Sequence, residues 1–340
     1  MNAWFTLAPM LLLAGALVWP RYGGFARWRR ARQLAARSQR EDVVKHILKC
    51  EASGQPATLA SIAGALQIST SQVAELLVQL EVHGLVSYEQ GALGLTPAGQ
   101  EMALHIVRAH RLWESYLAEQ TGVAEAEWHQ RAERQEHLLT PKETAALAAQ
   151  LGHPTYDPHG DIIPETSGDL ATADRQALTA TPLNEAVLIS HIEDEPETIY
   201  AQLCAQGLRP GMRAFVIEKS AQRIRFWADG NEHVLAPVLA NNIEVVPLPE
   251  SRPQDLVQQE FLSSLKPGGR AKVLGLSPAC RGPERRRLLD LGFVPGTPVE
   301  VEMISPAGDP TAYRVRGTVI ALRREQAGLI RIATEEAIPA

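Results

Sequence analysis

Two short stretches of the chain place histidine and glutamate residues on single helix faces. His110 and Glu114 lie four residues apart. The second stretch has four such residues at positions i, i+4, i+7 and i+8: His129, Glu133, Glu136 and His137. Residues at these spacings share one face of a helix. Two neighbouring helices could therefore direct imidazoles and carboxylates into one space, and such a cluster needs a cation because carboxylates at short range repel one another.

The donor types favour manganese or iron as that cation, because imidazole and carboxylate ligands without thiolate suit these ions. One alternative stays open: arginines lie within both stretches, and ion pairs on a solvated helix give a similar pattern. We predict no enzyme. The chain has no H-E-x-x-H zinc motif, and Arg134 stands where a di-iron Glu-x-x-His pair ending at His137 would need glutamate.

Charge is distributed unevenly along the 340 residues. The first 40 contain seven arginines and no acidic residue, whereas the other 300 contain 26 basic and 39 acidic residues, a net charge of −13. A nucleic-acid binder usually carries a basic face, and here only the N-terminal segment is plainly basic. The three cysteines lie far apart, which indicates a reducing compartment and no thiolate metal site.

The N-terminus contains an apolar run from Trp4 to Trp19. As a helix it would span about 24 Å, slightly less than a ~30 Å hydrocarbon core. The arginines follow the run, whereas a secretory signal carries its charge before it. We therefore predict a single transmembrane anchor at 1–20 and a basic juxtamembrane segment at 21–37, with residues 21–340 on the cytoplasmic side of the cell inner membrane. A cleaved or soluble segment is the alternative.

Residues 38–100 are predicted to form a winged helix-turn-helix domain. Apolar periodicity and capping residues indicate three helices, the third from Ser71 to His83, followed by a small hairpin. The third helix would enter the major groove of DNA. Its candidate DNA contacts are polar: Ser69, Thr70, Ser71, Gln72 and Gln79. None is basic, so phosphate contacts must come from elsewhere, and a role in protein interaction stays open.

The C-terminal half repeats one pattern, in residues 183–248 and 267–333. The sequence GLRPG at 207–211 recurs as GFVPG at 292–296, each after an amphipathic helix and before alternating strands. Glycine and proline punctuation with period-2 strands indicates two small β-barrels. Residues 249–266 between them are predicted to form a linker.

The order of these motifs resembles the iron-dependent (diphtheria toxin) repressor family, whose manganese-sensing branch includes the manganese transport regulators. Over residues 38–170 a winged helix precedes RAHRLWESYL, WHQRAERQEHLL and LGHPTYDPHGDIIPE. The resemblance implies an all-α metal-binding and dimerisation domain at 101–178, a homodimer, and Mn²⁺ or Fe²⁺ as the cofactor. The doubled copies resemble the SH3-like domain of long members and the FeoA proteins, the second more closely through Leu288–Phe293.

The resemblance also implies the ligands, residue by residue. Glu133 falls where iron-type members have cysteine and manganese-type members have glutamate. Asp42 falls where iron-type members have methionine and manganese-type members have aspartate. Lys45 departs from the manganese pattern, which has glutamate there. Glu195 and Glu197 fall near the place where long members lend carboxylates from the SH3-like domain. The predicted metal ligands are Asp42, His110, Glu114, His129, Glu133, Glu136 and His137.

Together these features predict a multidomain α+β protein with an N-terminal transmembrane helix, a winged helix, an all-α domain and two small SH3-like β-barrels. The predicted function is a membrane-anchored, metal-dependent DNA-binding repressor of metal homeostasis, in which the ion couples the winged helix to the dimerisation domain. Its expected partners are operator DNA, a second copy and the membrane. The alternative is a membrane-bound metal-sensing adaptor that acts on a metal transporter without binding DNA.

Overall fold

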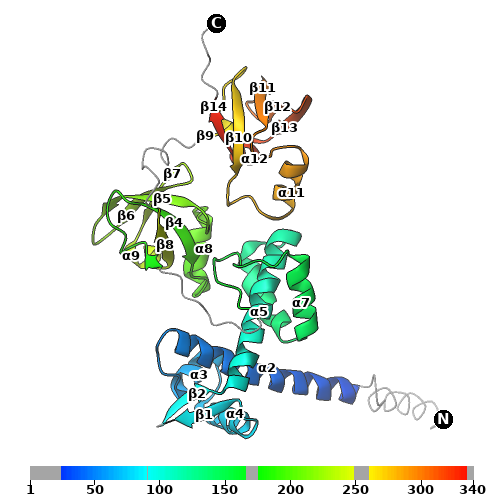
Figure 1. Cartoon of the computed structure of the whole chain (residues 1–340), viewed down its shortest axis with the longest axis vertical. Coiled ribbons are helices and arrows are strands. Elements are labelled where there is room, and N and C mark those ends of the chain that lie inside the picture. The colour runs from blue at the N-terminus through cyan, green and yellow to red at the C-terminus, as the bar shows by residue number, and fades with distance from the viewer. Residues whose placement is uncertain (1–23, 90, 166–174, 249–259, 335–340) are drawn as a thin grey trace, which may run out of the picture. The chain divides into compact units, whose positions relative to one another are not determined.

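The computed structural model describes residues 24–89, 91–165, 175–248 and 260–334 (Figure 1). These residues form two compact units. Among the described residues, the first unit comprises the chain up to His110, Glu133–Thr144 and residues 164–165. The second comprises Arg111–Ala132, Ala145–Ile163 and the residues from 175 onward. Each unit is described by itself below.

The described part of the first unit starts with three helices and a hairpin (Figure 1). They are α2 (Gly24–Ala52), α3 (Leu59–Leu66), α4 (Thr70–Val82), β1 (Val86–Glu89) and β2 (Ala92–Leu95). Thr58 and Ser69 start α3 and α4 with capping boxes, in which the side-chain oxygen accepts a hydrogen bond from the backbone N–H three residues later. Val44, Ile62 and Leu80 pack in a shared core. The predicted three helices and hairpin are therefore present.

Helix α2 begins much earlier than the predicted domain boundary at residue 38. It continues without a break through most of the segment predicted as a separate juxtamembrane region. The sequence ARQLAAR at 31–37 consists of strong helix formers and lacks glycine and proline, so nothing interrupts the helix there. Arg29 and Arg32 are exposed on it. The predicted anchor at 1–20 lies outside the described residues.

The all-α region follows the hairpin. Its elements are α5 (Pro97–Gln120), the 3₁₀ turn η1 (Glu125–Glu127), α6 (Trp128–Glu136) and α7 (Pro141–Gln150). Helices α5 and α6 coincide with the two stretches of predicted ligands. The boundary between the two units falls within α5, after His110, and within α6, before Glu133.

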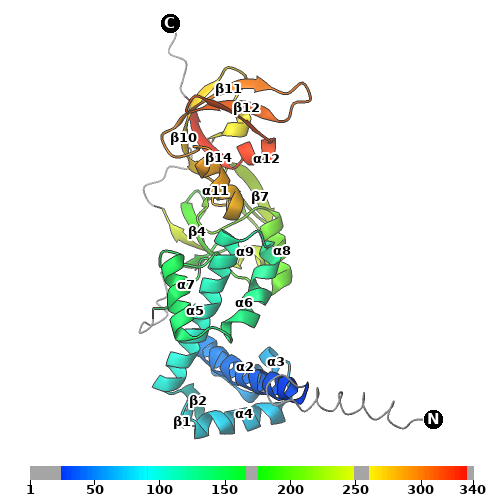
Figure 2. The same ribbon diagram turned by 90° about the vertical axis from the view of Figure 1, so that its right-hand side faces the viewer.

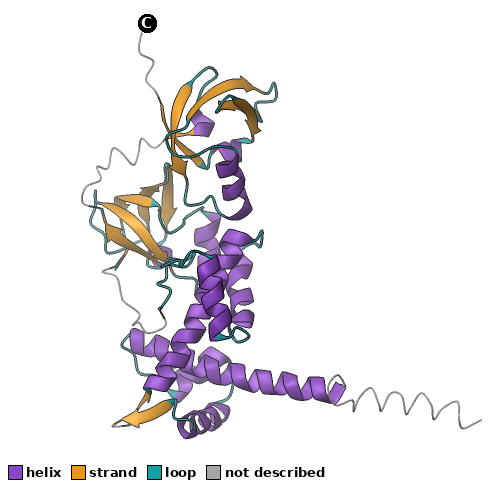
Figure 3. Ribbon diagram, turned by 45° about the vertical axis from the view of Figure 1, so that its right-hand side comes forward, coloured by secondary structure: helices purple, strands orange, loops and turns teal. Residues whose placement is uncertain are grey.

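The second unit contains two six-stranded antiparallel sheets, drawn in orange in Figure 3. The first sheet has the order β3-β8-β4-β5-β6-β7 and the second has the order β9-β14-β10-β11-β12-β13. Counted along the chain, both orders are the same: first strand, last strand, then the remaining four in sequence. The topology thus confirms that the C-terminal half is a duplication.

The strands of the first sheet are β3 (Gln176–Ala177), β4 (Ala186–Ile192), β5 (Arg213–Lys219), β6 (Ile224–Ala228), β7 (Asn231–Leu235) and β8 (Ile243–Pro247). Those of the second sheet are β9 (Glu260–Phe261), β10 (Arg270–Leu276), β11 (Pro298–Ile304), β12 (Thr311–Val315), β13 (Thr318–Leu322) and β14 (Ile330–Thr334). Figure 2 labels β10, β11, β12 and β14 of this sheet. Helix α8 (Glu197–Ala205) or α11 (Gly282–Asp290) follows the second strand of each copy, and α9 (Pro237–Ala240) or α12 (Arg324–Ala327) precedes the last.

Both copies begin earlier than predicted. Strand β9 and the 3₁₀ turn η2 (Leu262–Ser264) lie in the segment predicted as a linker, and Leu262 is buried in the second core. Strand β3 pairs with β8 although it was placed in the preceding domain. Strands of two residues are too short to show alternation, so no periodic pattern marks them.

Candidate metal centre

A first cluster of potential ligands lies within the first unit. It consists of Asp42 on α2, Glu136 at the end of α6 and His137, which offer ligand atoms within 4.8 Å of one another. His137 Nε2 is 3.1 Å from Asp42 Oδ1, and His137 Nδ1 is 2.7 Å from Glu41 Oε2. The cluster thus joins the first helix of the winged-helix region to the end of α6.

A lysine side chain already contacts the first cluster. Lys45 Nζ donates hydrogen bonds of 2.9 Å to both carboxylate oxygens of Glu136, and His110 Nδ1 hydrogen-bonds to the same carboxylate. Burial would raise the pKa of Glu136, but the His110 hydrogen bond and the charge of Lys45 outweigh it and lower that pKa. The lysine that departs from the manganese pattern therefore compensates the charge of a predicted ligand.

The imidazole of His137 also carries a positive charge that compensates the nearby carboxylates. Burial acts to lower the pKa of His137, but its hydrogen bonds to Asp42 and Glu41 raise that pKa to about 9. Glu41 was not predicted to take part, because it lies one residue from Asp42 on a helix and neighbours in sequence point in different directions. Glu133, which was predicted as a ligand, is exposed on α6 and is not among the three grouped residues.

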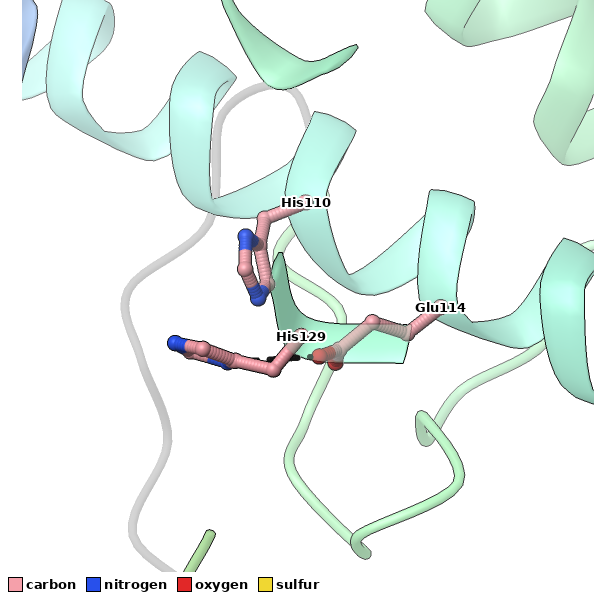
Figure 4. Close-up of side chains that lie close together, drawn as sticks. All are labelled: His110, Glu114 and His129. Atoms are coloured by element: carbon pink, nitrogen blue, oxygen red, sulfur yellow. Dashed lines mark ion pairs between the residues drawn. The ribbon is translucent and has the colours of Figure 1, made fainter. Parts of the chain in front are cut away.

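A second cluster lies within the second unit. Glu114 on α5, His159 in the loop after α7 and Asp194 after β4 offer ligand atoms within 4.8 Å of one another. His129 on α6 joins them, since its Nδ1 is 2.9 Å from Asp194 Oδ2 and 3.5 Å from Glu114 Oε1. Figure 4 shows the latter ion pair, with His110 one turn before Glu114 on α5.

The chemistry of His159 fits a metal ligand. Its side chain is only 2% exposed, and Nε2 lies 3.6 Å from Glu114 Oε1. Within the described part of the chain, neither ring nitrogen makes a hydrogen bond of ordinary geometry. Burial would lower the pKa of His159, but the carboxylates of Glu114, Asp157 and Asp194 raise it to about 9. A buried imidazole directed at carboxylates without a hydrogen-bond partner suits a site that completes itself with a cation.

The loop that carries His159 is held in place by hydrogen bonds to its backbone groups. Asp157 Oδ1 accepts hydrogen bonds from the N–H groups of His159 and Asp161, both at 2.9 Å. The carbonyl oxygen of His159 accepts one from Ile192 N–H at 3.0 Å. Gly160 has φ +92°, and a Cβ there would lie 2.0 Å from the carbonyl oxygen of Ser190. The loop therefore docks on β4, close to Asp194.

His159 and Asp194 were both missed from the sequence. His159 lies in the quoted segment LGHPTYDPHGDIIPE, but a single histidine in a loop has no helical partner to mark it. For Asp194, the expectation had been a carboxylate at Glu195 or Glu197. Asp194 immediately precedes Glu195, and the structure brings this earlier residue to His129.

The candidate DNA contacts all lie on the exposed side of the region around α4. Two of them have a local structural role, because Ser69 and Gln72 form the capping box of α4. Thr70, Ser71 and Gln79 remain as exposed polar groups on this helix.

A winged helix followed by helices with imidazole and carboxylate clusters defines a metal-dependent regulator. Comparisons with known proteins agree with this class. The domain described as "Iron dependent repressor, metal binding and dimerisation domain" matches residues 96–165, and the FeoA domain matches residues 261–334. A manganese-dependent transcriptional repressor in complex with manganese is 30% identical; the match covers 62% of this chain and 100% of that chain, with a TM-score of 0.56.

The iron-dependent repressor IdeR of Mycobacterium leprae is 28% identical over 211 residues, which is 58% of this chain and 91% of that protein. A probable metal transport system membrane protein of Chlamydia trachomatis is 45% identical over 82 residues, or 24% of this chain, and the chain matches only 18% of that relative's length. The chain belongs to the iron- and manganese-dependent repressor family. Membership confirms the predicted class of regulator, as opposed to an enzyme, and the predicted pair of cofactor metals.

The predicted location in the inner membrane is wrong. The two relatives described above that match more than half of the chain are named as an iron-dependent repressor and a manganese-dependent transcriptional repressor. Among the residues that the structure describes, no helix combines the length and apolar character needed to cross a membrane. The predicted membrane and transporter partners therefore lack support, and the apolar run from Trp4 to Trp19 lies outside the described residues.

Proposed function

We propose that this protein is a DNA-binding transcriptional repressor of metal homeostasis that responds to Mn²⁺ or Fe²⁺. The observation that carries the proposal is the first cluster. Asp42 belongs to the first helix of the winged-helix region, whereas Glu136 and His137 belong to the end of α6. A cation bound by all three would favour the arrangement in which these elements lie together, and a ligand shifts an equilibrium through such differential affinity.

The residues proposed to hold an ion in the first cluster are Asp42, Glu136 and His137. Two carboxylates and one imidazole form a hard donor set, which suits manganese or ferrous iron. The bound ion would supply the positive charge that lets both carboxylates stay close. His110 and Glu41 would orient the set, because each hydrogen-bonds to one of its members.

The residues proposed to hold a second ion are Glu114, His129, His159 and Asp194. They come from α5, α6, a loop and the end of β4, so an ion there would join the all-α region to the first sheet. The donor set again contains no sulfur. The ring nitrogens of His159 support this assignment, because they are buried beside Glu114 and make no hydrogen bond of ordinary geometry.

DNA binding is proposed to use α4 as the helix in the major groove. Its exposed polar side chains can hydrogen-bond to base edges. Because α4 has neither lysine nor arginine, the phosphate contacts must come from other elements, and binding should depend on salt. We propose that the protein acts as a homodimer, in keeping with the dimerisation domain matched at 96–165.

The test is metal-dependent DNA binding by the full chain. Fluorescence anisotropy would follow binding to duplexes from upstream of its own gene, with Mn²⁺, with Fe²⁺ under anaerobic conditions, and with a chelator. We expect binding that needs metal and weakens with salt. The double variant Glu136→Ala, His137→Ala should lose the metal response, while Gln130→Ala, at an exposed position on the same helix, should keep it.

Metal binding without any metal-dependent DNA binding would contradict the proposal. That result would favour a metal-sensing adaptor, for which the absence of cations on α4 is the supporting observation.

A further inference from the structure

An arginine of the second C-terminal copy lies beside the second cluster. Arg281 precedes α11, and its Nη2 donates a 3.0 Å hydrogen bond to the carbonyl oxygen of Pro158. Its guanidinium carbon is 6.0 Å from the centroid of the Trp128 ring, within the range of a cation–π contact. Pro158 precedes His159 and Trp128 precedes His129 in the sequence. One side chain thus touches the neighbours of two proposed ligands.

The aromatic rings of this region connect the same residues. Trp128 and His159 meet edge to face at a centroid distance of 6.4 Å, and His159 meets Tyr200 of α8 at 4.9 Å. Tyr200 donates a 2.6 Å hydrogen bond to Glu125. A shift of Trp128 would therefore be felt directly by His159, because packed side chains have few alternative positions.

The position of Arg281 is costly for an isolated side chain. Its Nη1 is buried and has no hydrogen-bond partner in the described part of the chain. Burial lowers the pKa of Arg281, and the charge of Glu125 partly opposes that effect. A buried N–H donor without a partner costs free energy. An arginine at the surface would not carry this cost. Its placement here therefore indicates that Arg281 positions the groups that it contacts.

The second copy is also fixed to the helix that carries Glu114. Arg286 Nη2 donates a 3.1 Å hydrogen bond to the carbonyl oxygen of Glu119, near the end of α5. A Cβ at Gly282 (φ +59°) would lie 3.0 Å from the carbonyl oxygen of Ala118 and 3.1 Å from that of Thr121. The last carbonyls of a helix have no partner within the helix, and here α11 approaches them closely.

We propose that Arg281 is a positioning residue for the second cluster, through which the second C-terminal copy sets metal affinity at His129 and His159. The inference rests on the proposed ligand set of that cluster. It gives the FeoA-type copy a function that its own residues would not suggest, since neither cluster of potential ligands contains a residue of that copy. Arg281 touches no proposed ligand, so its effect passes through Pro158 and Trp128.

The expected effect is selective. Losing a residue that orients metal ligands typically costs 10–100-fold in metal affinity. We expect Arg281→Gln to weaken binding at the second cluster by roughly tenfold. The first cluster, which lies within the other unit, should bind with unchanged affinity.

The experiment uses the full chain, calorimetric titration with Mn²⁺ and the visible absorption of bound Co²⁺, which reports ligand geometry. Asp194→Asn first identifies the signal of the second cluster. Arg281→Gln should weaken that signal and alter its Co²⁺ spectrum, whereas Arg281→Lys, which keeps the charge, should restore part of both. Arg287→Gln, at an exposed position on α11, is the matched control and should behave as the unchanged protein.

The outcomes separate the two levels of the proposal. If Asp194→Asn changes the titration but Arg281→Gln stays within about twofold of the unchanged protein with the same spectrum, the positioning role is overturned. If Asp194→Asn has no effect, the proposed ligand set itself is wrong. Should Arg281→Gln fail to fold in a thermal melt, Arg281→Lys decides by the same criterion, because it retains a cation at the buried position.

Discussion

The two clusters solve the same electrostatic problem in different ways. In the first, the Lys45 ammonium bonds to both oxygens of Glu136 and supplies a fixed positive charge. In the second, the carboxylates of Glu114 and Asp194 form ion pairs with histidines, and His159 has a pKa of about 9. An ion that enters the first cluster competes with the tethered ammonium of Lys45 as well as with a proton on His137, whereas an ion that enters the second competes with a proton on His159. The clusters should therefore respond differently to mutation of the charged side chain beside them.

The largest expected effect comes from removing ligands of the second cluster. The double variant His159→Gln, Asp194→Asn should weaken Mn²⁺ binding there by on the order of 100-fold, or about 3 kcal/mol. The first cluster should keep its affinity, because its members come from other segments. Calorimetry that resolves two binding events would measure this.

Glu195→Gln is the matched control for that variant. Glu195 adjoins Asp194, but its side chain is 54% exposed and its Oε1 is 3.9 Å from His129 Nε2. The Mn²⁺ affinity of the second cluster should change little in the Glu195→Gln variant. A larger loss from Glu195→Gln than from Asp194→Asn would show that the carboxylate expected from the sequence, and not Asp194, is the ligand.

The next effect concerns pH. With pKa values of about 9, His159 and His137 are protonated at pH 7 in the metal-free protein. A metal binds only the neutral ring and releases the proton, so apparent affinity should rise by about tenfold per pH unit and per proton between pH 7 and 9. Titrations in buffers of different ionisation enthalpy would count the protons. Affinity that is flat across this range would contradict the assignment of both histidines.

The same pKa values give a prediction for the metal-free fold. A raised histidine pKa stabilises the folded state fully below about pH 6.5, and this contribution is lost as pH rises through 9. Unfolding of the metal-free protein should therefore become easier between pH 7 and 9, and bound metal should counteract the loss. Chemical denaturation at fixed pH, with and without Mn²⁺, would measure the difference. Equal denaturation midpoints at pH 7 and 9 without metal would contradict it.

The clusters also differ in how far the sequence could reveal them. His110, Glu114, Glu136 and His137 were identified because they lie on helices whose periodicity is visible, and the family resemblance added Asp42. His159 and Asp194 come from a loop and the end of a strand, where no spacing rule applies. Their meeting depends on loop docking against β4, through Gly160 and the backbone of His159. Tertiary contacts of this kind are not encoded in any local pattern.

The fold shows the same contrast. The duplicated sheets were predictable from the Gly-x-x-Pro-Gly turns, whose terminal glycines all have positive φ, such as +77° at Gly207 and +94° at Gly292. The two-residue strands β3 and β9 were not. The basic segment at 21–37 was interpreted as a separate region on account of its charge, yet its helix formers extend α2 back to Gly24. Charge pattern and helix propensity are independent, and propensity decided the local structure.

Replacing Lys45 should have a smaller effect than the ligand substitutions, and in the opposite direction. Removing its charge with Lys45→Gln should strengthen Mn²⁺ binding at the first cluster, because the ion no longer competes with an ammonium for Glu136. The Lys45 side chain is 28% exposed, so water screens part of its charge, and we expect a gain of roughly fivefold, about 1 kcal/mol. Lys142→Gln, at an exposed position on α7, controls for the change in net charge. A loss of affinity in Lys45→Gln would mean that the lysine positions Glu136 for the ion.

The smallest effect is expected at Glu133, where sequence and structure disagree. The sequence pattern includes this glutamate among the ligands, whereas the structure leaves it exposed on α6 and outside the group formed by Asp42, Glu136 and His137. If Asp42, Glu136 and His137 suffice, Glu133→Gln should change Mn²⁺ affinity by less than about twofold, the small effect expected of an exposed charge screened by water and salt. A tenfold loss or more would place Glu133 in the coordination sphere of the ion. Titration of Glu133→Gln beside Lys45→Gln therefore tests whether the first cluster is complete in the arrangement described.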